Sequence, residues 1–355
     1  MAAPAADRLT SKRVELRDYR SVQEHFWVEG WTDGLPVVPP TEDLVEIFLD
    51  VAGIEPHQVV GLLPERNREI VAEKVAINAV MAGCLPEYFP VVLAAWQCMA
   101  APEWNLNSGA LSTSGPAPLV IVNGPVAKQI GMRSGQNLFG PGNRANATIG
   151  RAVRLMLINL AGAAGDLDKA CTGHPGKYSY CIAEDEEVGL TGWEPLHVQR
   201  GFKPEESAVT VVNLEAPQHV RDEFSATPEG MLDNYCDHVR TWNQAGASVV
   251  VMNPEHRQVV KDAGWSKADV SRYLFEHSGR TYAEMKRSSR MKGELDPGDE
   301  ERSFRWARSA DDFLVVGGGS PGWFSAVLPP WAGGIYSEPV TSLVPELGCA
   351  GECFI

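Results

Sequence analysis

The sequence predicts an α/β protein with a mostly parallel sheet and flanking helices, in which the C-terminal half is Rossmann-like and the N-terminal half is rich in loops. Short runs of branched apolar residues are typical of buried strands, and in the C-terminal half they alternate with helical patterns. Such alternation favours parallel strands joined by right-handed crossovers. The length of 355 residues predicts two domains, which we place at 1–205 and 206–355.

The N-terminal half opens with a rigid loop. Asp33-Gly34 and three prolines within 31–41 exclude a helix there and predict a turn followed by extended chain. Apolar patterning then predicts, in order, buried helices over 70–82 and 86–100, a buried strand over 116–123, and a helix from Arg144–Asn146 to about Leu160. The following stretch, 162–207, reads as irregular chain.

The C-terminal half follows a more regular pattern. We expect strands over 208–214 and 247–253, helices over 228–244 and 253–263, and a last strand that enters the glycines at 317–319. Ser266 and Asp269 have the spacing of a capping box, as do Thr281 and Glu284, so each pair predicts a helix start. The charged residues of 286–305 indicate an exposed connection.

Composition limits the partners and the compartment. The 31 Lys and Arg residues against 46 Asp and Glu give a formal charge of −15, which argues against a nucleic-acid partner because phosphate backbones bind basic faces. The sequence has no long apolar stretch and no apolar region near residue 1, so we expect no membrane span, no signal peptide and a cytoplasmic location. Seven cysteines, an odd number, favour reduced thiols.

The clearest candidate for ligand binding is the helix start within 134–151. A helix N-terminus exposes N–H groups with partial positive charge, and Arg144 and Arg151 lie seven residues apart on one helical face. With Asn143 and Asn146 they predict a substrate-binding site for a carboxylate or a phosphate. The alternative is that the asparagines cap the helix and the arginines pair with surface acids.

Residues 171–187 hold the densest set of reactive side chains. His174 and Lys177 flank a Pro-Gly turn that places an imidazole near an ammonium group, and Tyr178 and Cys181 follow closely. We assign these four residues catalytic roles, in proton transfer or thiol chemistry. The spacing does not match a zinc site, so we predict no metal; a metal site and a purely structural loop are the alternatives.

Further candidate positions lie at predicted loop ends. Ser114 precedes the strand over 116–123, Asn123 ends it, and Gly318 and Ser320 follow the last strand, where glycines let backbone N–H groups approach an anion. These glycines lack the context of a dinucleotide fingerprint, so they do not indicate a nucleotide cofactor, and the sequence leaves the cofactor unknown.

Cys349 and Cys353 form a Cys-x₃-Cys pair near residue 355. On a mobile tail such a pair could shuttle electrons by disulfide exchange. On an immobile one it could be inert or ligate a metal. We therefore include both thiols among the catalytic candidates.

Seven segments carry a resemblance that spans about residues 30–335: WTDGLPVVPPT, EKVAINAVMAGC, VNGP, FGPGNRANATIGRA, HPGKYSYCIAEDEE, WEPLHVQRGF and GWSKADV. Together they resemble a little-characterised bacterial family of partner or fused components of UGSC-motif (seleno)proteins. The UGSC motif itself is absent, and the nearest segment is the C-terminal CAGEC. The resemblance implies a bacterial enzyme component with a polar site built from the Gly-Asn-Arg and His-Pro-Gly-Lys-Tyr segments, and a second subunit.

These observations favour an enzyme that acts on a small anionic metabolite, a carboxylate or a phosphate. Thiol-dependent reductive cleavage, sulfur transfer and a lyase step all fit the residues. One alternative is a non-catalytic partner or scaffold subunit of a UGSC-type thiol or selenol enzyme, and another is a metalloenzyme with Cys/His ligands. A homo-oligomer or a second protein subunit is the expected assembly.

Overall fold

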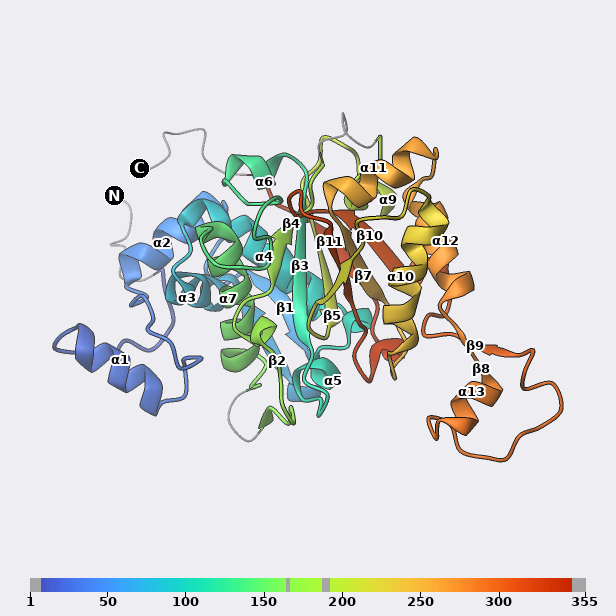
Figure 1. Cartoon of the computed structure of the whole chain (residues 1–355). Helices are drawn as coiled ribbons and strands as arrows, with labels where there is room; N and C mark the ends of the chain where they lie inside the picture. The colour runs from blue at the N-terminus through green and yellow to red at the C-terminus, as the bar shows by residue number, and fades with distance from the viewer. Residues whose placement is uncertain (1–7, 164–166, 187–191, 347–355) are drawn as a thin grey trace.

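Two four-stranded sheets stand side by side at the centre of the molecule (Figure 1). The computed structural model describes residues 8–163, 167–186 and 192–346. In one sheet the order is β12 (Val340–Leu343), β5 (Ala208–Leu214), β3 (Ala117–Asn123) and β4 (Cys181–Ala183). In the other it is β10 (Phe313–Gly317), β7 (Ser248–Met252), β11 (Phe324–Leu328) and β6 (Gln218–Arg221).

The α/β class is confirmed, but both sheets are mixed. Only the β3–β4 and β7–β10 pairs are parallel among the described neighbours in these two sheets, and the others are antiparallel. A parallel return needs a crossover of about a dozen residues or more, so the short loop 318–323 between β10 and β11 imposes the reverse direction. A mostly parallel sheet and a Rossmann-like half are therefore not confirmed.

The two sheets share one apolar layer. Side chains of β3 and β5, such as Leu119 and Val212, form a single buried cluster with Val251, Val316 and Leu328 of the other sheet. Strands β5 and β12 lie after residue 205, and β5 pairs with β3 on one side and with β12 on the other. The first sheet therefore contains strands from both sides of residue 205.

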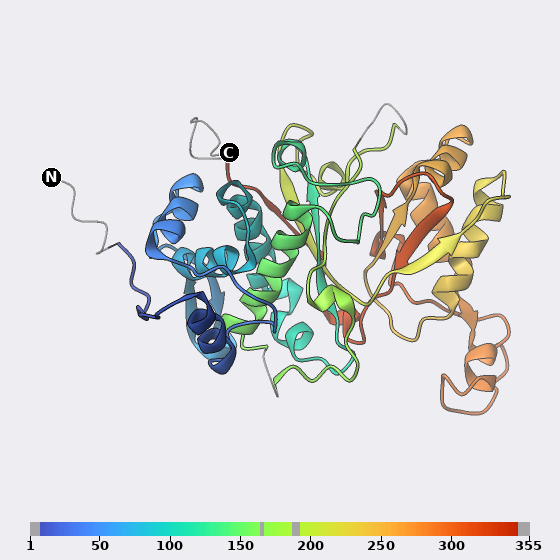
Figure 2. The ribbon, with the colours of Figure 1, turned by 60° about the vertical axis from the view of Figure 1, so that its left-hand side comes forward.

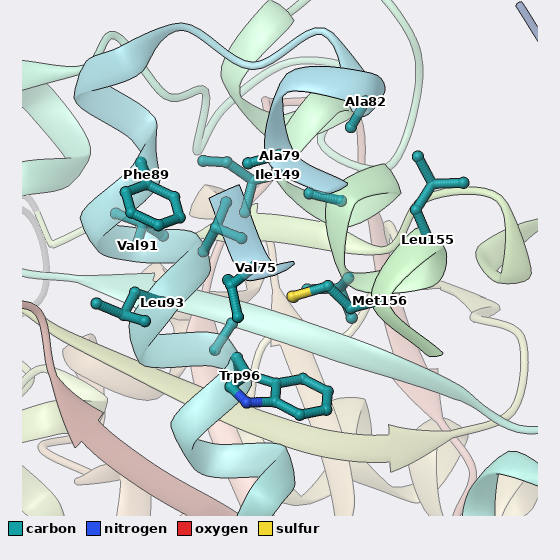
Figure 3. Packing of buried hydrophobic residues seen from close by; sticks show 14 of the residues in the cluster. Val75, Ala79, Ala82, Phe89, Val91, Leu93, Trp96, Ile149, Leu155 and Met156 are labelled. Atoms are coloured by element: carbon teal, nitrogen blue, oxygen red, sulfur yellow. The ribbon is translucent and has the colours of Figure 1, made fainter. Parts of the chain in front are cut away.

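Helices pack on the outer face of the first sheet and bury the largest apolar cluster. They are α2 (Glu42–Val51), α3 (Ala72–Ala82), α4 (Phe89–Ala100) and α7 (Arg144–Asn159). Figure 3 shows Val75, Phe89, Trp96, Ile149 and Met156 from three of these helices meeting in that cluster. The sequence thus predicts α3, α4 and α7, although it misses α2 and the hairpin of β1 (Val59–Leu63) and β2 (Arg68–Val71) that precedes α3.

The second sheet carries its own helices, namely α10 (Pro228–Arg240), α11 (Pro254–Asp262), α12 (Lys267–His277) and α13 (Tyr282–Arg287). Both predicted capping boxes form, at Ser266 and at Thr281. Shorter helices are α5 (Leu106–Ala110), α6 (Pro125–Gln129) and α9 (Leu196–Gln199). Within 8–163, 167–186 and 192–346, no helix is long and apolar enough to cross a membrane.

Two segments project from opposite sides of the body (Figures 1 and 2). One is α1 (Tyr19–Val28), near the N-terminus. The other contains α13 and the short strands β8 (Arg280–Thr281) and β9 (Ser303–Phe304), and it includes the charged stretch that we expected to be exposed.

A buried carboxylate ties the sheets together at their upper edge. Glu184 follows β4 and accepts hydrogen bonds from Asn123 Nδ2 at 2.7 Å and from the Leu196 amide at 2.8 Å. It also accepts one from the Gly317 amide of β10 at 3.4 Å and forms a 2.6 Å ion pair with Lys267 of α12. One side chain thus holds four segments of the chain.

Candidate functional site

The predicted anion site at the start of α7 is occupied by contacts within the protein. Asn143 caps the helix, because its Oδ1 accepts the Asn146 amide at 3.0 Å, and its Nδ2 donates to Gly131 O at 2.8 Å. The buried Asn146 side chain accepts from the Arg133 amide and donates to the Arg133 carbonyl, both at 2.9 Å. The two asparagines therefore hold the loop 131–143, as in the capping alternative.

The two arginines of α7 also bind the protein itself. Arg144 donates through Nε and Nη2 to Gly83 O, at 3.1 Å each. Arg151 makes two 2.9 Å contacts with the Asp33 carboxylate, and its Nη2 also donates to the carbonyls of Leu35 and Pro36. These arginines fix the end of α3 and the loop 31–41.

The His174 imidazole lies at the opposite end of the strands of the first sheet, beside Leu214 at the end of β5. Its Nδ1 accepts the Gly176 amide at 3.2 Å, so in the neutral ring Nε2 carries the proton and donates to Leu214 O at 3.3 Å. The ring also meets Tyr180 edge-on, with centroids 5.7 Å apart. Burial lowers the pKa of His174 below its usual 6.5 and favours this neutral form.

Lys177 ends the turn of 3₁₀-helix at 175–177 and pairs with Asp168 at 2.9 Å. Arg154 of α7 reaches the same carboxylate at 2.8 Å, so two cations share one anion. Burial lowers the pKa of Lys177, although Asp168 opposes the shift. Arg154 and Lys177 also line a small surface depression of about 10 Å³, which has room for a single water molecule.

Glu215 completes the group, and sequence reasoning did not select it. The residue follows β5, and because β5 runs antiparallel to β3 its end lies where β3 begins, beside Ser114. Burial raises the pKa of Glu215, while a hydrogen bond from Ser114 and the charge of Lys177 oppose the rise. Its Oε1 is buried and has no hydrogen-bond partner among the described residues.

We call Ser114, Asp168, His174, Lys177 and Glu215 the Lys177 cluster. Three of the five were selected from the sequence, and the fold brings them together from loops far apart in the chain. Glu215 was missed because only the sheet reveals the direction of β5, and Asp168 and Arg154 were missed because their pairing becomes visible only in the fold.

The other catalytic candidates differ in exposure. Tyr178 is solvent-exposed, whereas Cys181 is buried in β4 and burial raises the pKa of its thiol, which is the environment of a packing residue. Cys349 and Cys353 lie outside the described residues. Among the described cysteines only Cys171 is exposed, and its amide donates to Thr113 O next to Ser114.

The remaining binding candidates lie at the other edge of the sheets. Asn123 donates to Glu184 and to Glu186, at 2.7 Å each. The Gly318 amide donates to Met252 O, and a Cβ on Gly318 would lie 2.7 Å from Leu138 Cδ2, so a larger residue would displace the Leu138 side chain. Ser320 is half-buried. These residues do not meet the Lys177 cluster.

In the described part of the chain, no three His, Cys, Asp or Glu side chains are grouped so as to hold a metal ion. Comparison with protein-family models, curated proteins and solved structures finds no match for this chain.

Proposed function

We propose that the chain is an enzyme that transfers a proton to or from a small anionic metabolite, and that the Lys177 cluster is its active site. The observation that carries the proposal is the meeting of three half-buried titratable groups of different chemistry, His174, Lys177 and Glu215, each with its pKa shifted by burial. Such groupings are typical of functional sites.

Each group has a distinct role in this scheme. Lys177 and Arg154 share one carboxylate, which leaves positive charge to attract a carboxylate or phosphate. Glu215, with its raised pKa and an unpartnered buried oxygen, is suited to take up or deliver a proton. Neutral His174 supplies the second proton-transfer group.

Of the reaction types that the residues allow, a lyase step needs only proton transfer and binding of the anion. Reductive cleavage and sulfur transfer also need a reactive thiol, and the Cys181 thiol selected for that role from the sequence is buried in β4, where burial raises its pKa. The proposal therefore favours the lyase step.

The first test is ligand binding. Inorganic phosphate or succinate should raise the melting temperature of the wild type, since a ligand at a hundred times its Kd adds about 2.7 kcal/mol of stability, and glucose should not. Lys177→Met should abolish the shift while Arg154 still pairs Asp168. Lys128→Met, at an exposed lysine of α6, is the matched control.

The second test is chemistry. In D₂O, a metabolite mixture incubated with the protein should yield a species that gains deuterium, detected by mass spectrometry. Glu215→Gln and His174→Gln should each slow this incorporation by about a hundredfold or more. A wild type that binds neither anion and labels no metabolite overturns the proposal.

One observation favours the second candidate, a non-catalytic subunit that docks on a partner protein. Helix α1 projects from the body and exposes Tyr19, Trp27 and Val28 to 58%, 62% and 77%. Sedimentation with the product of the neighbouring gene should then show a stable complex that Trp27→Glu dissociates. A complex that forms equally with Trp27→Glu, or no complex, removes this candidate.

A further inference from the structure

A groove of about 910 Å³ lies between the N-terminal segment 9–16, α1 and the helices α2 and α3. This volume is in the range of cavities that enclose small molecules. Lys74, Ile77, Asn78 and Met81 line it from one face of α3, at helical spacings of three and four residues. None of the residues that line the groove belongs to the Lys177 cluster.

The N-terminal segment is fastened over the groove by hydrogen bonds. The Glu73 carboxylate accepts from the Thr10 amide at 3.0 Å, the Thr10 hydroxyl at 2.9 Å and the Ser11 amide at 2.8 Å. Lys74 Nζ donates to Ser11 Oγ at 2.7 Å. The wall formed by this segment is therefore fixed by specific polar contacts.

Apolar side chains form the inner part of the groove. Phe26 and Trp31 stand edge to face with ring centroids 5.3 Å apart, and Ile70 and Met81 are almost fully buried. An apolar body placed here gains the burial energy of about 25 cal/mol per Å² of surface removed from water.

The charges of the lining favour an anion. Glu73 is saturated by the N-terminal segment and Glu42 pairs with Arg13, which leaves Glu69 as the other lining carboxylate. Three lining cations, namely Lys12, Arg68 and Lys74, form no ion pair among the described residues. The lining thus holds four cations, Lys12, Arg13, Arg68 and Lys74, against three carboxylates, in a chain whose net charge is −15.

We propose that this groove binds an amphipathic carboxylate, with its apolar body between Phe26 and Met81 and its carboxylate beside Lys74. Lys74 is the best placed of these cations because its side chain is half-buried, whereas Lys12 and Arg68 are exposed, and its Nζ donates to the neutral Ser11 hydroxyl. The site is separate from the Lys177 cluster, so the inference does not rest on the proposed function.

Calorimetric titration with dodecanoate, and with dodecanol as the uncharged probe of equal length, tests the proposal. Dodecanoate should bind the wild type at least tenfold more tightly than dodecanol. Lys74→Met should weaken dodecanoate by about tenfold, equivalent to about 1.4 kcal/mol, and leave dodecanol unchanged. Lys128→Met should change neither, and Met81→Trp, which fills the groove, should abolish both.

Three results overturn the proposal: no binding of dodecanoate to the wild type, equal affinity for the two probes, or binding that Met81→Trp does not reduce. If the chain sediments as a dimer that Met81→Trp cannot form, a second copy occupies the groove and the proposal is likewise overturned. Circular dichroism and the melting temperature establish that each variant is folded, and Lys74→Gln replaces Lys74→Met if the latter is not.

Discussion

Replacing Arg151 by Ala tests whether this arginine holds the fold or a ligand. Its guanidinium makes two 2.9 Å contacts with Asp33 and two further hydrogen bonds to carbonyls of the loop 31–41. The side chains of Arg151 and Asp33 are only 16% and 3% exposed. The substitution leaves the Asp33 carboxylate buried without its counter-charge.

Removing one partner of a buried pair costs roughly 3–5 kcal/mol. An unfolding entropy of about 2.1 cal/mol/K per residue over 355 residues amounts to about 0.75 kcal/mol/K. The expected fall in melting temperature is therefore about 4–7 °C, and the partial exposure of Arg151 favours the lower end.

The pH dependence gives a second readout. Burial raises the pKa of Asp33, but the hydrogen bond and charge of Arg151 outweigh it and hold the pKa below 3.8. The stability from this pair is present above about pH 3.8 and is lost as the pH falls through the folded-state pKa. The difference between wild type and variant should therefore shrink on acidification.

Differential scanning calorimetry near pH 7 and at acidic pH measures the fall in melting temperature and its pH dependence. The Asp33→Ala/Arg151→Ala double variant should regain part of the lost melting temperature, because it leaves no unpaired charge buried. Arg144→Ala is the matched control, since its exposed side chain donates only to Gly83 O in the described chain and should cost about 1 kcal/mol. A melting temperature of Arg151→Ala within 1 °C of wild type, with lost anion binding, refutes this reasoning and restores the ligand-binding role.

Three further predictions concern other parts of the chain. Glu73→Gln should release the N-terminal segment and speed tryptic cleavage after Lys12 several-fold; unchanged cleavage contradicts the assigned contacts. Iodoacetamide should modify Cys171 of the native protein and spare the buried Cys181, which peptide mapping measures, and equal labelling is the contrary result. Because burial lowers the pKa of His174 below 6.5, stability should decline as the pH falls below about 6.5, and His174→Gln should flatten that decline; parallel pH profiles argue against it.

Local signals in the sequence predicted local structure. The capping boxes at Ser266 and Thr281 depend on residues three apart, so they form as expected. The helices over 70–82 and 86–100 were also found to within a few residues, because apolar spacing along one segment determines which face is buried.

Long-range pairing could not be predicted in this way. The residues around Arg151 do not indicate that it pairs with Asp33, which lies 118 residues away in sequence. From the sequence alone, an arginine that binds a ligand therefore cannot be distinguished from one that binds a loop of the same chain. The direction of β5 likewise depends on its pairing with β3, and without it Glu215 has no visible connection to Ser114.

The carboxylate of Glu184 has a consequence for how the molecule opens. It accepts the Leu196 amide of α9 and, at longer range, the Gly317 amide at the end of β10 in the second sheet. The two sheets cannot separate from each other without exposing the Glu184 carboxylate and its partner Lys267. The chain should therefore melt as one cooperative unit, and in native-state hydrogen exchange the amides of Leu196 and Gly317 should report the same opening event.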